Sequence, residues 1–186
     1  DNSVEMLQIA REKTSQDFLY LLQDMREFEL YGTVKAVISV CDSVNYITKK
    51  EELRKVFQLV NNYLDPEGVF IFDFNTIYKY KEVMGDTVIA ENREDCSFIW
   101  ENYYDLQERI NEYDLTIFVK QQKDLFRKFT ETHLQRGYTL EQMQEILQKA
   151  GLVFLKAIDV DTQGEVTEQT ERICIIAREH GKRKEA

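Results

Sequence analysis

Cysteine and histidine are scarce in this chain, which narrows the kinds of site that it can form. Its 186 residues include two histidines and three cysteines, at positions 41, 96 and 174. An odd number of widely spaced cysteines fits reduced thiols in a cytoplasmic protein better than a disulfide framework or a zinc site. We therefore expect a cytoplasmic location and no bound metal.

Long apolar runs and an excess of positive charge are also absent. No apolar run approaches the roughly 20 residues of a membrane-spanning helix, so we expect a protein outside the membrane. Lysine and arginine together number 24 against 34 aspartates and glutamates, which gives a formal net charge of −10 at pH 7. Because sequence-independent affinity for nucleic acids comes largely from lysine and arginine, this composition disfavours a nucleic-acid partner.

The chain does have enough apolar material for one core, since 43% of its residues are hydrophobic. We therefore expect a single domain over residues 1–186. Short apolar runs predict buried parallel strands at 18–22 (FLYLL), 36–41 (AVISVC) and 69–74 (VFIFDF). Apolar residues at helical spacing predict helices at 3–13 and 51–64. Strands that alternate with helices are typical of an α/β sheet with right-handed crossovers.

The pattern changes between about residues 87 and 136, where apolar residues alternate with polar ones over long segments. This period of two predicts three strands in an antiparallel meander that is inserted into the α/β domain. Residues 138–152 then predict a helix with Thr139 as cap, Gln142 three residues on and Gly151 at its end. Two closing apolar runs predict strands that pair as a hairpin-like edge, at 152–158 and 172–178.

Four acids stand where predicted strands end or a helix begins: Asp1, Asp24, Asp42 and Asp73. Ligands of open α/β sheets bind outside the carboxyl ends of the strands, so these acids are candidate site residues. Asp1 can accept hydrogen bonds from the hydroxyls of a ribose, or it can simply cap the helix that follows. Asp24 can take an adenine amino group with Met25 against the ring, or it can be a turn acid beside a core methionine.

Polar side chains are dense after two of the predicted strands. They are Asp42, Ser43, Asn45 and Tyr46 after residues 36–41, and Asp73, Asn75 and Thr76 after the run VFIF. These groups offer carboxylates, hydroxyls, amides and a phenol to a ligand, but the same residue types also form turns with side-chain to backbone hydrogen bonds. The density of polar groups favours a site in the loop that begins at Asp42.

Several segments carry a resemblance to a known family. In order, DNSVEMLQIAREK, LLQDMREFEL, AVISVCDSVNYI and LDPEGVFIFDFNT resemble the second to fifth strand regions of class I S-adenosylmethionine-dependent methyltransferases. IWENYYD, ETHLQRGYTLEQM and AGL resemble a group of uncharacterised bacterial methyltransferases of the small-molecule type. The resemblance covers nearly the whole chain. It implies a Rossmann-like sheet, S-adenosylmethionine as cofactor and an unidentified small-molecule methyl acceptor, with residues 87–136 as a lid or substrate subdomain.

The resemblance also implies roles for individual residues. Asp1 is the expected ribose ligand, Asp24 the ligand of the adenine amino group, and Met25 packs on the base. The expected cofactor-binding set is completed by residues beside the adenosine and the methionine part of the cofactor: Met6, Cys41 and Asp42. Side chains after the strands line the acceptor side, and these are Asn45, Tyr46, Asn75 and Thr76.

The predicted meander supplies further candidates for acceptor binding. A lid whose aromatic faces suit an amine or a cation can be formed by Trp100, Tyr103, Tyr104, Arg136 and Tyr138. Equally, Trp100 and Tyr104 can form the apolar underside of the meander together with Phe98.

Methyl transfer depends mostly on the alignment of the reacting groups, and it needs a base only if the acceptor arrives protonated. The expected catalytic residues are Asp42 and His133, with Glu131 and Tyr104 as further candidates. His133 is favoured among them because histidine ordinarily titrates near neutral pH. The alternative for His133 is a strand histidine paired across the meander.

The sequence also departs from the family pattern. In the family, a first strand and a glycine-rich loop come before the ribose-binding acid, whereas here Asp1 is the first residue. Without those strands the sheet would keep unpaired buried backbone groups, so we expect the chain to be part of a larger polypeptide. Two other functions remain open, a non-catalytic S-adenosylmethionine-binding protein and a partner-interaction protein with a degenerate fold. A methyltransferase acting on RNA is disfavoured by the acidic composition. The oligomeric state is left open.

Overall fold

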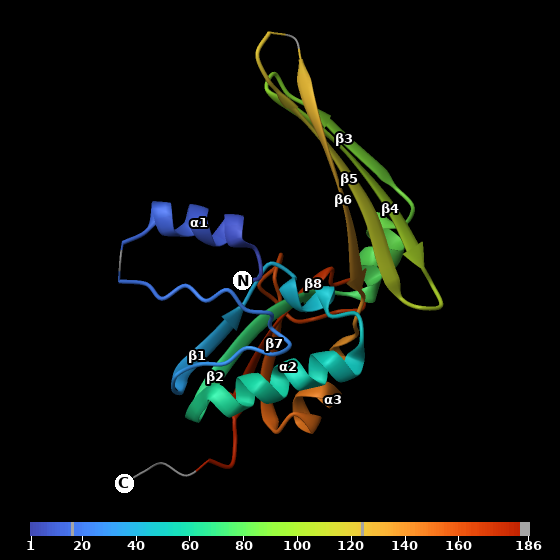
Figure 1. The fold of residues 1–186 in the computed structure, drawn as a ribbon. Coiled ribbons are helices and arrows are strands. Elements are labelled where there is room, and N and C mark those ends of the chain that lie inside the picture. The colour runs from blue at the N-terminus through green and yellow to red at the C-terminus, as the bar shows by residue number, and fades with distance from the viewer. Residues whose placement is uncertain (16, 124, 183–186) are drawn as a thin grey trace.

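The computed structural model describes residues 1–15, 17–123 and 125–182, and Figure 1 shows their arrangement. One sheet has the strand order β1-β2-β8-β7 and the other has the order β3-β4-β5-β6. The strands of the first sheet are β1 (Val34–Ser39), β2 (Leu64–Asn75), β7 (Leu152–Asp159) and β8 (Arg172–Glu179). Those of the second sheet are β3 (Val88–Asn92), β4 (Cys96–Asp105), β5 (Ile110–Lys120) and β6 (Phe126–Arg136).

Helices α2 (Lys50–Tyr63) and α3 (Leu140–Lys149) pack on one face of the first sheet (Figure 1). Apolar residues recur at helical spacing along α2, so they share the face that lies against the sheet and is buried. On this face Phe57 packs against strand β2, with its ring centroid 4.9 Å from that of Phe72. This core is closed by Leu53, Phe70, Phe74, Met143, Leu147 and Ile175, each fully buried or nearly so. Helix α1 (Val4–Lys13) stands apart, and none of its residues is buried.

The predicted α/β class and most predicted elements are confirmed. The predicted helix at 138–152 is α3, with a capping box in which the Thr139 hydroxyl accepts from the backbone of Gln142 and the Gln142 side chain accepts from the backbone of Thr139. Gly151 follows it at a φ of +82°, a left-handed conformation that glycine adopts without strain.

The predicted strand at 18–22 is wrong. This segment pairs with no strand in the described part of the chain, and Phe18, Leu19 and Leu22 are exposed. A strand exists through ladder hydrogen bonds to a neighbour, which an apolar run cannot provide for itself. The predicted strand at 36–41 exists as β1 and runs parallel to β2. It is not buried as expected, since Ile38 is 64% exposed. The reason is that β1 has β2 as its one partner among the described strands.

Three further details differ from the sequence-based expectation. The strand predicted at 69–74 begins earlier, so that β2 includes the DPEG segment that was expected to precede it. The meander has four strands rather than three, because residues 88–92 add β3 beside β4. Strands β7 and β8 pair as predicted, but β8 lies between β7 and β2 instead of at the edge.

The second sheet projects away from the first (Figure 1). The two sheets meet where β1 and β2 end, because β1 leads through residues 40–42 into the 3-10 turn η1 (Ser43–Tyr46), and η1 contacts both β2 and β6. Strand β2 leads into η2 (Lys79–Met84), a π-helical turn, and from there into β3. This junction holds most of the polar residues that the sequence singled out.

Candidate active site

The loop after β1 has an unusual backbone. Cys41 and Asp42 are consecutive residues at positive φ, 62° and 49°. Such conformations cost non-glycine residues of order 1–3 kcal/mol each and persist where the surroundings hold them. Here the carboxylate of Asp73 on β2 holds them, since its Oδ2 accepts from the Cys41 amide at 3.2 Å and its Oδ1 accepts from the Asp42 amide at 2.7 Å. Arg172 on β8 donates to the same carboxylate at 2.7 Å.

This backbone directs the Asp42 side chain towards the meander. Gln135 on β6 donates to the Asp42 carboxylate at 2.6 Å, and the Tyr80 hydroxyl donates to the other end of the Gln135 amide at 2.9 Å. Asn75 donates in turn to the Tyr80 oxygen at 3.1 Å. Burial raises the pKa of the Asp42 carboxyl above its ordinary value, and the hydrogen bond from Gln135 offsets part of that effect.

Replacing Asp42 with asparagine should therefore have an effect on stability that depends on pH. An acid whose pKa is raised in the folded state stabilises the fold below its ordinary pKa, here 3.8, and that contribution is lost as the pH rises through the raised value. Asparagine does not ionise, so Asp42→Asn should gain stability relative to the wild type between pH 3.5 and pH 7. Urea unfolding of both proteins at the two pH values measures this, and an equal difference at both would contradict it.

A second cluster joins η1 to the meander through aromatic groups. The Tyr46 hydroxyl lies 2.9 Å from the Tyr113 hydroxyl on β5 and 3.0 Å from Nδ1 of His133 on β6. The imidazole stacks on the Tyr113 ring, with centroids 4.6 Å apart, and its Nε2 lies 3.2 Å from the Glu131 carboxylate. On the other side of Tyr113, the Trp100 ring packs at 4.8 Å. Tyr46 thus links the loop after β1 to an aromatic face of the second sheet.

Other predicted acceptor-side residues hold the junction together. The Asn45 amide is fully buried and donates to the carbonyls of Asn75, at 2.9 Å, and Arg136, at 2.8 Å, while accepting from the Asn75 amide at 2.9 Å. Three more side chains hydrogen-bond backbone carbonyls across it: Arg136 to Thr48, Tyr138 to Ile47, and Thr76 to Thr170. Asn45, Arg136 and Tyr138 thereby hold the loop against the end of the meander. Thr76 instead ties the end of β2 to the segment before β8.

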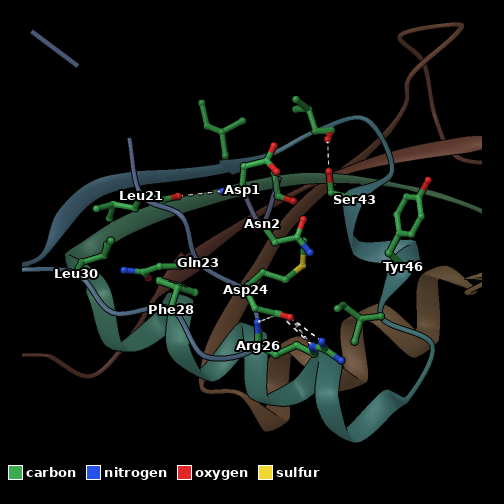
Figure 2. Close-up of a pocket in the computed structure, with 15 residues that line it drawn as sticks. Asp1, Asn2, Leu21, Gln23, Asp24, Arg26, Phe28, Leu30, Ser43 and Tyr46 are labelled. Atoms are coloured by element: carbon green, nitrogen blue, oxygen red, sulfur yellow. Dashed lines mark hydrogen bonds and ion pairs between the residues drawn. The ribbon is translucent and has the colours of Figure 1, made fainter. Parts of the chain in front are cut away.

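A cavity of about 960 Å³ opens on the other side of the loop (Figure 2). Its polar lining includes the side chains of Asp1, Asp24 and Tyr46 (Figure 2). Its apolar lining comes from three segments of the chain: Leu21, Met25, Phe28, Leu30, Ile38, Val40 and Ile47. The two acids lie in one cavity because the backbone amide of Gln23 donates to the Asp1 carbonyl at 2.9 Å.

The two carboxylates differ in their partners. Asp24 forms an ion pair with Arg26 at 2.6 Å and accepts from the Arg26 backbone amide at 2.8 Å, which together lower the pKa of Asp24 to about 2. One oxygen of Asp1 accepts from the Ser3 amide at 2.8 Å. Each carboxylate offers about four acceptor positions. Asp1 therefore keeps lone pairs for a ligand, whereas those of Asp24 are occupied by the backbone amide, Nε and Nη2 of Arg26.

The structure thus divides the predicted residues into two groups. Asp1, Asp24, Met25 and Tyr46 line the cavity. Met6 lies on α1, outside that lining, and Cys41 and Asp42 follow Val40 at its edge without lining it. The second group lies at the junction and in the meander: Asp42, Asn45, Asn75, Thr76, Trp100, Tyr104, His133, Arg136 and Tyr138. Tyr46 belongs to both groups.

Sequence reasoning missed Tyr113, Gln135, Tyr80 and Arg172 as members of the site. A signal existed for two of them, because Tyr113 continues the alternation that includes Leu115, and Gln135 continues the one that includes His133. No local signal marks Arg172, whose contact with the site depends on β8 lying beside β2.

The cavity fits a ligand that combines a flat ring with a polyhydroxylated part. Its volume lies within the range of about 300–1,000 Å³ that is usual for cofactor and small-molecule sites. The apolar side chains can cover a ring, and the carboxylates can accept from hydroxyl and amino groups. Within the described ranges, no three histidine, cysteine, aspartate or glutamate side chains form a group that could hold a metal. Among the helices of those ranges, none is long and apolar enough to cross a membrane.

Comparison with protein-family models gives no match. Over 181 residues the chain is 35% identical to the Bacillus subtilis (strain 168) protein named "Putative methyltransferase YqeM", which covers 96% of this chain and 73% of that protein. A structure titled as a S-adenosylmethionine-dependent methyltransferase from Clostridium acetobutylicum ATCC 824 superposes with a TM-score of 0.89 at 29% identity, covering 97% of this chain and 74% of that one.

The fold is shared more widely. CalS10 from Micromonospora echinaspora, an amino pentose methyltransferase solved with S-adenosylmethionine bound, superposes with a TM-score of 0.71 at 20% identity, covering 96% of this chain and 71% of that one. These matches confirm the resemblance and the Rossmann-like α/β fold expected from it. The chain belongs to the class I S-adenosylmethionine-dependent methyltransferases.

Proposed function

We propose that the cavity of Figure 2 binds S-adenosylmethionine and that a small-molecule methyl acceptor lies between Tyr46 and the meander. One observation carries the proposal. A single cavity joins two carboxylates, a set of apolar side chains and the Tyr46 phenol, and Tyr46 reaches the aromatic face of the second sheet. When bound, the cofactor supplies an electrophilic methyl group.

The cofactor-binding residues follow from their chemistry and positions. Asp1 would accept from the ribose hydroxyls, with Met25 packed on the base. Asp24 would accept from the adenine amino group in exchange for one of its contacts with Arg26. Cys41 and Asp42, at the strained turn beside Val40, would lie next to the methionine part of the cofactor. Met6 would contact the adenosine from α1 if that helix moves closer on binding.

Residues 87–136 would serve as the lid or substrate subdomain. The acceptor side is assigned to Asn45, Tyr46, Asn75, Thr76, Trp100, Tyr104, Arg136 and Tyr138. Of these, Tyr46 and Trp100 would offer aromatic faces to the acceptor. Asn45, Thr76, Arg136 and Tyr138 donate to backbone carbonyls and would act by positioning the segments around it. Asp42 and His133 are the proposed bases for an acceptor that arrives protonated. A small acceptor is supported by the shared fold of CalS10, whose title names an amino pentose.

We further propose that the protein works in the bacterial cytoplasm. Cys41, Cys96 and Cys174 are free thiols, as a reducing compartment allows, and the relatives come from Bacillus and Clostridium.

Replacing Asp24 with alanine should weaken S-adenosylmethionine binding about 10- to 100-fold, because a hydrogen bond to a charged group is worth roughly 1.5–3 kcal/mol. Calorimetric titration of S-adenosylmethionine and S-adenosylhomocysteine into the whole protein measures this. Glu27→Ala is the matched control, since it removes an exposed acid of the same segment that lies outside the cavity.

Wild-type affinity in Asp24→Ala would contradict the assignment of the cavity. Tight binding without methyl transfer to any small molecule would favour a protein that holds the cofactor without turnover.

A further inference from the structure

A series of hydrogen bonds leads from the cavity to strand β6 of the meander. Tyr46 lines the cavity and is 42% exposed, and the hydrogen bond between its hydroxyl and His133 is an exposed one. The Tyr46 hydroxyl lies 3.0 Å from Nδ1 of His133, and Nε2 of the same ring lies 3.2 Å from the Glu131 carboxylate. Three side chains from η1 and β6 are thus in series.

The chemistry of the partners assigns a direction to this series. A carboxylate has acceptor atoms only, so Glu131 requires the proton of neutral His133 to be on Nε2. Nδ1 is then a bare acceptor, and the Tyr46 hydroxyl donates to it. Every hydrogen bond of the series therefore points from the cavity towards Glu131.

Tyr113 completes the surroundings of the Tyr46 oxygen. Burial raises the pKa of the Tyr113 hydroxyl above its ordinary value, so this hydroxyl keeps its proton at neutral pH. With its own proton on the Tyr113 oxygen, it donates to Tyr46 across 2.9 Å. A phenolic oxygen has two lone pairs, so one remains for a donor arriving in the cavity.

We propose that Tyr46 takes the proton of the methyl acceptor while passing its own proton to His133, and that Glu131 positions His133 for this transfer. The inference rests on the proposed function and deepens it. In the step, the acceptor atom bonds to the methyl carbon as the sulfur–methyl bond breaks, and the sulfur keeps that electron pair. The acceptor proton moves to the Tyr46 oxygen, and the former Tyr46 proton moves to Nδ1 of His133. The acceptor must therefore carry an N–H or O–H group.

Transfer of labelled methyl groups tests the relay. The probe is S-adenosylmethionine with a radioactive methyl group, given with the small-molecule fraction of a bacterial lysate as acceptor. Tyr46→Phe should slow label transfer about 100-fold, at the lower end of the range for general acid–base catalysis. Glu131→Gln should slow it less, about 10-fold, because Glu131 only positions His133. Calorimetric affinity for S-adenosylmethionine should be unchanged in Glu131→Gln, because Glu131 lies outside the cavity lining. Tyr31→Phe is the control, because it makes the same change at a tyrosine that is 95% exposed.

Nitrogen NMR gives a second readout that does not depend on turnover. The chain has two histidines, so selective ¹⁵N labelling yields two rings to assign. We expect His133 with its proton on Nε2, a shifted Nδ1 signal in Tyr46→Phe, and a mixture of tautomers in Glu131→Ala.

The outcomes separate the two proposals. A proton on Nδ1, or label transfer that Tyr46→Phe leaves at the wild-type rate, would overturn the relay while leaving the methyltransferase assignment intact. Absence of both cofactor binding and label transfer in the wild type would overturn the proposed function and the relay with it.

Discussion

Replacing Asp73 with alanine should lower the free energy of unfolding by about 3 kcal/mol, because two backbone amides and a half-buried guanidinium lose their acceptor and each such loss costs about 1–3 kcal/mol. The Asp73 side chain is 8% exposed and accepts three hydrogen bonds, from the amides of Cys41 and Asp42 and from Arg172. Its removal takes away the ion-pair partner of the Arg172 guanidinium and releases two residues from positive φ. Urea unfolding at pH 7 measures the loss.

A second substitution checks that the loss comes from the isolated charge. In the Asp73→Ala background, Arg172→Met should recover part of the lost stability, because an apolar side chain replaces a half-buried cation that has lost its ion-pair partner. Asp73→Asn keeps one acceptor oxygen and should lose less than Asp73→Ala. A loss below about 1 kcal/mol in Asp73→Ala would place it among ordinary surface changes and contradict this account.

Asn45→Ala should cost about 3–4 kcal/mol of unfolding free energy. The fully buried Asn45 amide makes three hydrogen bonds to backbone groups of Asn75 and Arg136. Each buried group left without a partner costs about 1–3 kcal/mol, and rearrangement would recover part of the sum. Thermal or urea unfolding measures the effect.

Asn62→Ala is the matched control for this prediction. It makes the same change at an exposed position of α2, where the effect should stay within about 0.5 kcal/mol. Because Asn45 joins the ends of β2 and β6, Asn45→Ala should also weaken the attachment of the meander, seen as faster hydrogen exchange at the Asn75 amide. A stability equal to that of Asn62→Ala would contradict the role assigned to Asn45.

Local patterns were reliable where one element carries its own signal. Helix α3 has its cap at Thr139, its apolar stripe and Gly151 within a short stretch, so propensity and capping suffice to predict it. Period-two alternation likewise predicts the meander strands, because the pleat places every second side chain on the same face. The fourth strand, β3, was not predicted. Its five residues are all exposed, so they have no buried face that an alternation of apolar and polar residues would mark.

Features that depend on a neighbouring element could not be predicted from the local sequence pattern. The run FLYLL has the composition of a buried strand, but a strand forms only beside another strand, and the position of β8 between β2 and β7 is likewise decided by pairing. Candidate acids could be predicted from their places after strands. Which of them share a cavity could not, because Asp24 reaches Asp1 through a loop whose course no local residue specifies.

The sequence by itself determined the α/β class, the inserted meander, the core helices and the family, because each depends on spacing or on the order of motifs along the chain. Only the tertiary structure decided that Asp73 and Arg172 hold the loop of Cys41 and Asp42, and that Tyr46 joins the cavity to His133. These contacts link residues 30 to 100 positions apart, from Asp73 to Arg172 for example 99 positions. Their geometry comes from the pairing of β2 with β8 and from the contact of η1 with the second sheet, which a local pattern does not encode.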